Sequence, residues 1–509
     1  MKNKKTLASV LCLFLVFAMI LPMSAMATNQ EELTDNSEEA IAADAQNRST
    51  YSARIMQGNT NEEDDCRATE NGLLDSGSYT TSSIVETGWT YTNSTTSSIN
   101  TVRANATNFL YSKLYSFAYF SGHGSRTSGI ATLNVIPSNP SSASGTYTPF
   151  NVAETLGVDS STWLTDSNWS SSDNLRVLML AACYQLDSTI MHYYARAMRS
   201  SNVRAIAGYH ESGPGHSTDV TIADNFFTYA NAGNSVKYSW QYANTFGSVI
   251  YPWAVLVYTE NYNEYYRIPG FPGNTYTDPS SQASVYRFRS GLTGSQIVNY
   301  SRSISENESL PRYATVTENN RSAALLSNRE PISSSIDLPI NSSITDSYVA
   351  NVLARHSIDD LVCIQTPVYR DEINMEDGGS VSGSEVVVER IYHYYNTYNG
   401  IRIADASVVL GVDANGIYTV NNYWKDVTMP VSIADSECVN AYDLISERTA
   451  LSSIPVISRD EFILLRSSIV YAPIASDSTT YTLAYELIST DGRLAYVDAV
   501  TGDLLQYEY

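Results

Sequence analysis

Two apolar stretches of the chain each end in a residue that can carry chemistry. The first reads Phe117-Ala118-Tyr119-Phe120-Ser121-Gly122-His123-Gly124, and the second reads Val177-Leu178-Met179-Leu180-Ala181-Ala182-Cys183. Their apolar runs do not alternate with polar residues, which is typical of strands covered on both faces, as in a parallel sheet. We therefore expect His123 and Cys183 just beyond the carboxyl ends of two buried strands, the edge where open α/β sheets bind ligands.

The sequence after Cys183 continues as a β–α–β unit. Apolar residues recur at helical spacing from Ile190 to Met198, and the run Val203–Gly208 indicates another buried strand. Further helices are predicted over residues 220–231 and 235–245. These elements predict an α/β fold with a mainly parallel sheet flanked by helices.

A cysteine and a histidine at one sheet edge can perform nucleophilic catalysis. A thiolate is a strong nucleophile, and a nearby imidazole can take the thiol proton and return it to a leaving amine. The N–H of Gly124 is predicted to form an oxyanion hole with the N–H of Cys183 at the start of a helix. That helix N-terminus is also expected to lower the pKa of the thiol.

The paired motifs resemble those of caspase-like (clan CD type) cysteine peptidases, a group that includes caspases, legumains, gingipains, clostripain and metacaspases. Members carry a strand–His-Gly motif before a strand–Ala-Cys motif, and the gap of 60 residues here is compatible with that order. The resemblance implies a caspase-like fold with Cys183 as nucleophile, His123 as general acid/base and Gly124 as an oxyanion donor. Ala181 stands where many relatives carry an Asp that helps hold a basic P1 side chain.

Polar residues near the same edge are candidates for substrate binding. They are Glu211, His210 and Asp187, with Asp219 and His216 as further candidates. The segment Gly213-Pro214-Gly215 predicts a loop at the rim of the site.

The N-terminus has the pattern of a secretory signal peptide. Three lysines precede an apolar run that ends near Leu21, and Ser24-Ala25-Met26-Ala27 ends in an A-x-A pattern, so cleavage is expected after Ala27. The alternative is a membrane anchor, although the run is barely long enough to span a bilayer. We expect a secreted, extracellular protein that has no membrane partner once the signal is removed.

Composition divides the rest of the chain and limits its partners. The stretches are residues 1–27 (signal peptide), 28–75 (acidic flexible arm), 76–300 (caspase-like α/β domain), 301–345 (linker) and 346–509 (a smaller α+β domain). The 509 residues include 30 Lys plus Arg and 53 Asp plus Glu, a formal net charge of −23. This acidity argues against a nucleic-acid partner, because phosphate binding needs a clustered basic surface.

The C-terminal stretch resembles modules that accompany secreted peptidases. Tyr496-Val497-Asp498-Ala499-Val500-Thr501-Gly502 is similar to the closing strands of PepSY domains, and Tyr398-Asn399-Gly400-Ile401 is similar to propeptides of thermolysin-like peptidases. The pair Asn399-Gly400 also predicts a hairpin turn. The resemblance implies that this domain inhibits the peptidase intramolecularly or aids its folding; as an inhibitor it would make the chain a zymogen that proteolysis in the 300–345 linker activates. The alternative is a domain that binds substrate or cell wall.

Other chemistries lack their motifs. The sequence has no H-E-x-x-H, G-x-S-x-G, Walker or G-x-G-x-x-G motif, and no C-x-x-C spacing, so we expect no metal and no cofactor. Cys363 and Cys438 are either one disulfide or two buried thiols. We predict a secreted bacterial cysteine endopeptidase acting on protein or peptide substrates; the alternative is a non-catalytic secreted or cell-surface binding protein that keeps a caspase-like fold.

Overall fold

The computed structural model describes most of the chain from Tyr51 onward, and Tyr51–Tyr509 form one compact unit. The predicted signal peptide and residues 28–50 lie outside the described residues. The described residues are 51–57, 63–87, 114–127, 130–135, 148–151, 169, 174–199, 201–214, 217–245, 250–260, 266–273, 283–292, 302–318, 339–355, 362–373, 381–422, 425–428, 438–455, 462, 464–475, 479–489 and 494–508.

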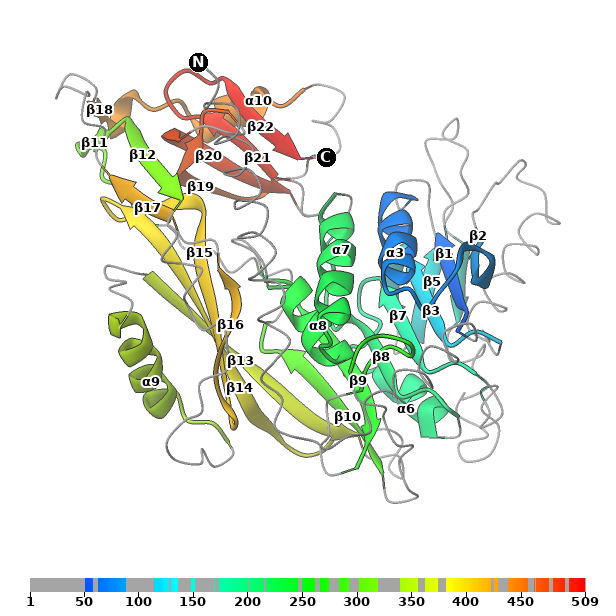
Figure 1. Ribbon diagram of the computed structural model, residues 1–509. Coiled ribbons are helices and arrows are strands. Elements are labelled where there is room, and N and C mark those ends of the chain that lie inside the picture. The colour runs from blue at the N-terminus through cyan, green and yellow to red at the C-terminus, as the bar shows by residue number, and fades with distance from the viewer. Residues whose placement is uncertain are drawn as a thin grey trace, which may run out of the picture. The chain divides into compact units, whose positions relative to one another are not determined.

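Five parallel strands form one end of a larger mixed sheet, in the order β2-β1-β3-β7-β8 (Figure 1). They are β2 (Ile84–Thr87), β1 (Ala53–Gln57), β3 (Phe117–Ser121), β7 (Val177–Ala181) and β8 (Ala205–Tyr209). The three strands predicted from apolar runs are thus confirmed as β3, β7 and β8. The predicted crossover helix is α6 (Met191–Arg199), between β7 and β8.

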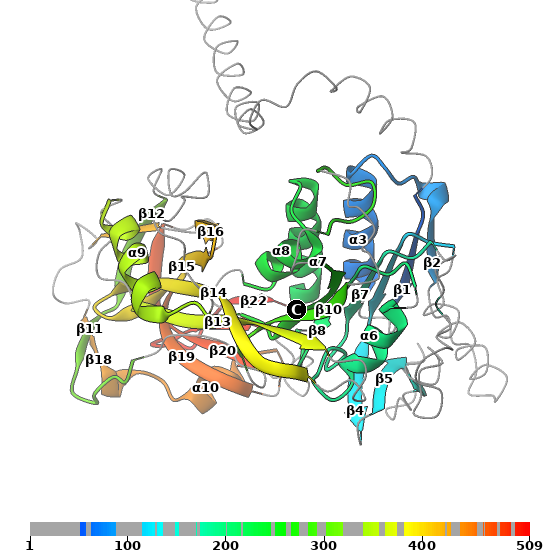
Figure 2. The same cartoon turned by 90° about the horizontal axis from the view of Figure 1, so that it is seen from below.

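Helices cover both faces of the parallel strands. Phe117 and Tyr119 point into one buried cluster, and Ala118 and Phe120 point into another. The first cluster lies under α3 (Glu63–Asp75), α7 (Ser217–Asn231) and α8 (Val236–Ala243), and the second under α6. Figure 2 shows α6 on the opposite side of the strands from the other three helices. This double cover explains why the strands are continuously apolar.

The prediction of a flexible acidic arm up to residue 75 is wrong for its last part. β1 pairs with both β2 and β3, and α3 packs on α7, where Asn231 Nδ2 donates to Gly72 O (3.3 Å). The segment is acidic overall, but its helix is amphipathic. Cys66, Ala68, Thr69 and Leu73 are buried, while polar residues between them face solvent.

Antiparallel strands continue this sheet from β8 across residue 300, so the predicted division into separate domains is not seen, and the prediction of a mainly parallel sheet holds only for the first five strands. These strands are β9 (Trp253–Thr259), β10 (Ser284–Ser290), β13 (Val362–Ile373), β14 (Val381–Tyr398), β15 (Ile401–Asp413) and β16 (Gly416–Asn422). The predicted hairpin at Asn399-Gly400 joins β14 to β15, and both residues have the positive φ (49° and 71°) of the predicted turn.

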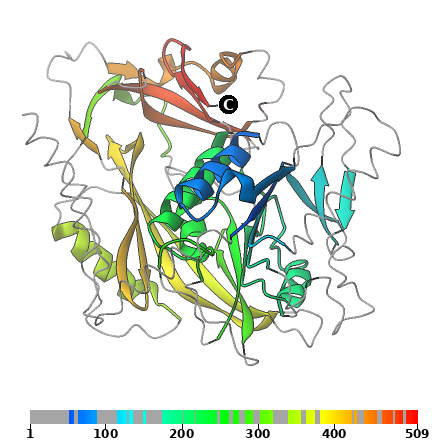
Figure 3. The ribbon, with the colours of Figure 1, turned by 45° about the vertical axis from the view of Figure 1, so that its right-hand side comes forward.

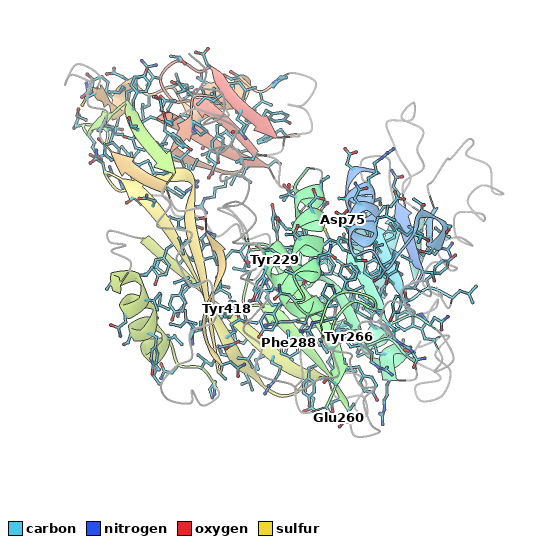
Figure 4. The ribbon with its side chains drawn as sticks, in the orientation of Figure 1. Asp75, Tyr229, Glu260, Tyr266, Phe288 and Tyr418 are labelled. Carbon is cyan, nitrogen blue, oxygen red and sulfur yellow. The ribbon has the colours of Figure 1, made fainter. Side chains whose placement is uncertain are left out.

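Polar and aromatic contacts bind α8 to these later strands. Lys237 Nζ lies 2.9 Å from Glu389 Oε2, and both side chains are about 1% exposed. Tyr418 packs edge-on against Tyr238 and also contacts Tyr242, which packs against Tyr229 of α7 (Figure 4). The later strands therefore share a core with the α/β part.

A second group of strands completes the chain. It comprises β12 (Tyr313–Glu318), β17 (Lys425–Thr428), β19 (Leu464–Pro473), β20 (Thr480–Ser489), β21 (Leu494–Asp498) and β22 (Leu504–Glu508). Smaller elements are β11 (Ser309–Pro311), α9 (Ser342–Arg355), β18 (Cys438–Asn440) and α10 (Glu447–Ser452). The predicted 301–345 linker thus contains β11, β12 and the start of α9.

Two predictions for the C-terminal half of the chain can be compared with the structure. The PepSY-like motif forms the β21–β22 turn, where Asp498 Oδ1 accepts from the N–H groups of Val500 and Thr501 (both 2.8 Å). Cys363 on β13 and Cys438 on β18 are both free and exposed, so neither the disulfide nor the pair of buried thiols is present.

Candidate active site

Strand register brings His123 and Cys183 to the same edge of the sheet. In the parallel pair β3–β7, Ser121 lies opposite Ala181, and each strand ends there. His123 and Cys183 therefore each lie two residues beyond the same pair of opposed residues, Ser121 and Ala181. The Gly122 N–H donates to Ala181 O (3.2 Å), which extends the pairing one residue beyond the strands.

Gly124 lies directly against the backbone of Cys183. A Cβ on Gly124 would be 2.2 Å from Cys183 O and 3.0 Å from Cys183 N. This close approach requires glycine and places the predicted oxyanion donor beside the predicted nucleophile. His123 and Gly124 begin β4 (His123–Thr127), which forms a small sheet with β5 (Ile130–Val135) and β6 (Thr148–Asn151) (Figure 3).

The predicted helix beginning at Cys183 is wrong. Cys183 is followed by turns, and α6 begins only at Met191. Tyr184 has a left-handed φ of 62°, a conformation that is strained for a bulky side chain and that breaks the helical path. Cys183 therefore does not lie at a helix N-terminus.

The loop after β8 supplies a different donor to the thiol. The Gly213 N–H donates to Cys183 Sγ at 3.2 Å. Tyr184 N–H donates to Glu211 O (2.9 Å), and its hydroxyl lies 3.0 Å from Ser212 Oγ, so this loop and the Cys183 turn hold each other. A backbone donor to sulfur favours the thiolate over the neutral thiol.

Gln185 is a buried part of the site that the sequence interpretation missed. Its Nε2 donates to Cys183 O at 3.1 Å, and its Oε1 accepts from the Tyr194 hydroxyl at 2.8 Å. Gln185 is fully buried. Its position two residues after the cysteine is visible in the sequence, but the partner on α6 depends on how the helix packs.

The predicted substrate-binding residues have different surroundings. Glu211 is half-buried and lies at the Cys183 edge through its carbonyl contact with Tyr184. Asp187 is buried and its Oδ1 accepts from Thr189 N (2.9 Å) and Thr189 Oγ1 (2.6 Å), a local turn contact. Substrate binding by these residues stays a prediction.

His210 is also buried, beside β10. Its Nε2 lies 3.3 Å from Ser290 Oγ, and burial lowers the pKa of His210 to about 3, helped by the positive charges of Arg289 and Arg287. The ring is therefore neutral at ordinary pH. His216 lies outside the described residues, and Asp219 is buried in the first turn of α7.

A buried carboxylate from α3 lies near the same edge. Asp65 is about 1% exposed, and its Oδ2 accepts from the Tyr119 hydroxyl (2.9 Å). Burial raises the pKa of Asp65 to about 6, although the hydrogen bond from the Tyr119 hydroxyl opposes that shift. Burial raises the pKa of the neighbouring Tyr209 well above its usual value, and the negative charge of Asp219 adds to the shift.

The described residues contain neither a metal-binding cluster nor a membrane-spanning helix. Within the described ranges, no group of three or more His, Cys, Asp or Glu residues is arranged to hold a metal ion. In that same part of the chain, no helix is long and apolar enough to cross a membrane. The sequence matches no protein-family model, and no curated protein matches it.

Proposed function

We propose that the chain is a secreted bacterial cysteine endopeptidase of caspase-like fold. One observation carries the proposal: register places His123 and Cys183 at equal distance beyond one rung of adjacent parallel strands, with Gly124 against the Cys183 backbone. A chance histidine and a chance core cysteine have no reason to coincide at the edge where α/β sheets bind ligands.

Each group has a role in peptide hydrolysis. The Cys183 sulfur attacks the scissile carbonyl carbon, the thiol proton passes to His123, and His123 protonates the leaving amine as the C–N bond breaks. Water then attacks the thioester with His123 as base, which releases the acid and restores the thiol. The N–H groups of Gly124 and Cys183 stabilise the oxyanion.

The Gly213 N–H supports the first step. By donating to Cys183 Sγ it stabilises the thiolate that attacks, which is the function first assigned to a helix N-terminus. The half-buried Glu211 in the same loop is the best placed of the candidate substrate-binding residues.

The test is cleavage of a peptide library by the full-length exported protein. Cleavage is expected from the wild type and from Cys363→Ser, a matched change of a free, exposed thiol on β13. It is expected to vanish in Cys183→Ala and His123→Ala. Equal cleavage by wild type and Cys183→Ala would refute the nucleophile assignment.

Secretion and control by the C-terminal region are separate proposals. N-terminal sequencing of the exported protein is expected to begin at Thr28. Inhibition by the C-terminal region is not cleanly tested by truncation near residue 300, because β13 pairs with β10 and its removal would expose that buried strand. The better sample is a chain that has been cut near residue 300 but whose C-terminal part stays bound to the α/β part.

A further inference from the structure

The turn after Cys183 is held by an arginine from a strand about a hundred residues later. Arg287 on β10 donates from Nη1 to Leu186 O at 3.3 Å. The same guanidinium donates from Nε and Nη2 to Asp371 Oδ2 of β13, at 2.9 and 2.6 Å. The side chains of Arg287 and Asp371 are 4% and 0% exposed, so the whole connection is buried.

The geometry of the sheet creates this connection. Arg287 lies directly opposite Asp371 in the antiparallel β10–β13 pair. The planar guanidinium can bind a carboxylate on one side and a carbonyl on the other, which a lysine ammonium cannot do from one position. Arg289 also approaches Asp371 Oδ2 (3.6 Å), so the carboxylate serves two arginines.

Leu186 is a sensitive point of the Cys183 turn. Its side chain is fully buried, its N–H donates to Tyr209 O (2.9 Å), and its carbonyl accepts from Arg287. Loss of the arginine would leave a buried carbonyl without this donor, and the turn would have to move to recover one. Only Tyr184 and Gln185 separate this carbonyl from Cys183.

We propose that Arg287 and Asp371 are positioning residues that fix the Cys183 turn through the Leu186 carbonyl. The inference rests on the proposed function of Cys183 as a nucleophile. It makes Asp371, a residue of the predicted C-terminal domain, part of what holds the active site in place. The later strands thereby support catalysis, whatever regulatory role they have.

The test compares two buried ion pairs that join the same two regions. Asp371→Asn removes the charge that holds Arg287, and Glu389→Gln removes the charge that holds Lys237 on α8. The readout is the pH profile of iodoacetamide alkylation at Cys183 in the full chain, followed by peptide mapping. Asp371→Asn is expected to slow alkylation about tenfold, given the cost of sub-ångström misplacement, while Glu389→Gln stays within about twofold of wild type.

A third variant keeps the result interpretable if Asp371→Asn does not fold. Arg287→Lys keeps the buried positive charge but cannot reach both Asp371 and Leu186, and it is expected to slow alkylation as Asp371→Asn does. In peptide cleavage, kcat is expected to fall with little change in KM.

Unchanged alkylation in Arg287→Lys, or equal slowing in Asp371→Asn and Glu389→Gln, would overturn the positioning role. Alkylation of Cys183 needs no peptide substrate. If the wild type failed to cleave peptides, that would count against the proposed function, but the alkylation rates of the variants would still test the positioning role of Arg287 and Asp371.

Discussion

Replacing Gly124 by alanine is the sharpest test of the site geometry. The new Cβ would lie 2.2 Å from Cys183 O and 2.7 Å from Gln185 Nε2. Such contacts do not occur below 3.0 Å, so the two backbones must separate from 2.2 to at least 3.0 Å, or about 0.8 Å. A misplacement of about 1 Å near reacting groups costs roughly 10²-fold in rate, which is about 2.7 kcal/mol of transition-state stabilisation. Overpacking should also lower the free energy of unfolding by about 1–3 kcal/mol.

The assay measures kcat/KM on a cleaved peptide and the alkylation rate of Cys183. Both values are divided by the fraction of folded molecules, which urea unfolding determines. Gly411→Ala on β15 is the control, because its Cβ would lie 2.3 Å from Tyr418 Cζ, a contact as close as that at Gly124 but with a side chain remote from Cys183. Both variants should lose stability, but only Gly124→Ala should lose activity. If Gly124→Ala kept kcat/KM within about threefold of wild type, the close packing of Gly124 on Cys183 would be irrelevant to function and the reasoning refuted.

Three further predictions follow from single contacts. Gln185→Met removes the donor to Cys183 O and the acceptor for the Tyr194 hydroxyl, and should lower kcat/KM by about tenfold or more. Tyr194→Phe removes only the second of these contacts and should lower kcat/KM by a smaller factor. Asp65 has a raised pKa of about 6, so the folded state holds its proton more tightly than the unfolded chain. Its contribution to the free energy of unfolding should therefore fall by up to about 3 kcal/mol as pH rises from about 4 to 6. Asp65→Asn should remove this part of the dependence of the free energy of unfolding on pH, as measured by urea unfolding at a series of pH values. No difference in slope between the two proteins would contradict the buried position of Asp65. Asn399→Ala places alanine at a φ of 49° and should cost about 1 kcal/mol of stability with unchanged Cys183 alkylation; an unaffected melting temperature would argue against that turn.

The strands that carry the candidate dyad were predictable because their signal is local. The runs Phe117–Phe120 and Val177–Ala182 are apolar throughout, and each stops at a polar or glycine-rich turn. Burial on both faces demands such runs, and the carboxyl ends of parallel strands share one edge. The hairpin at Asn399-Gly400 was predictable for the same reason, since positive φ at two successive residues strongly limits the choice of side chain.

On the N-terminal side, acidic composition gives a wrong prediction. It predicts a flexible arm over residues 28–75, whereas residues 53–57 form an inner strand and residues 63–75 a helix on the sheet. Net charge reports solubility rather than fold, and the buried face of α3 is hidden among charged neighbours. Asp65, on that helix, was therefore missed.

What the sequence determined by itself was the identity and the sheet edge of His123 and Cys183, because buried strands and the turns that end them leave local patterns. What only the tertiary structure decided was how the thiol is held: the left-handed turn at Tyr184, the Gly213 donor, Gln185 with Tyr194, and the Arg287–Asp371 connection. The two partners in that last connection are 84 residues apart. Contacts of this kind depend on strand register and on which element lies beside which, and no local pattern of residues encodes them.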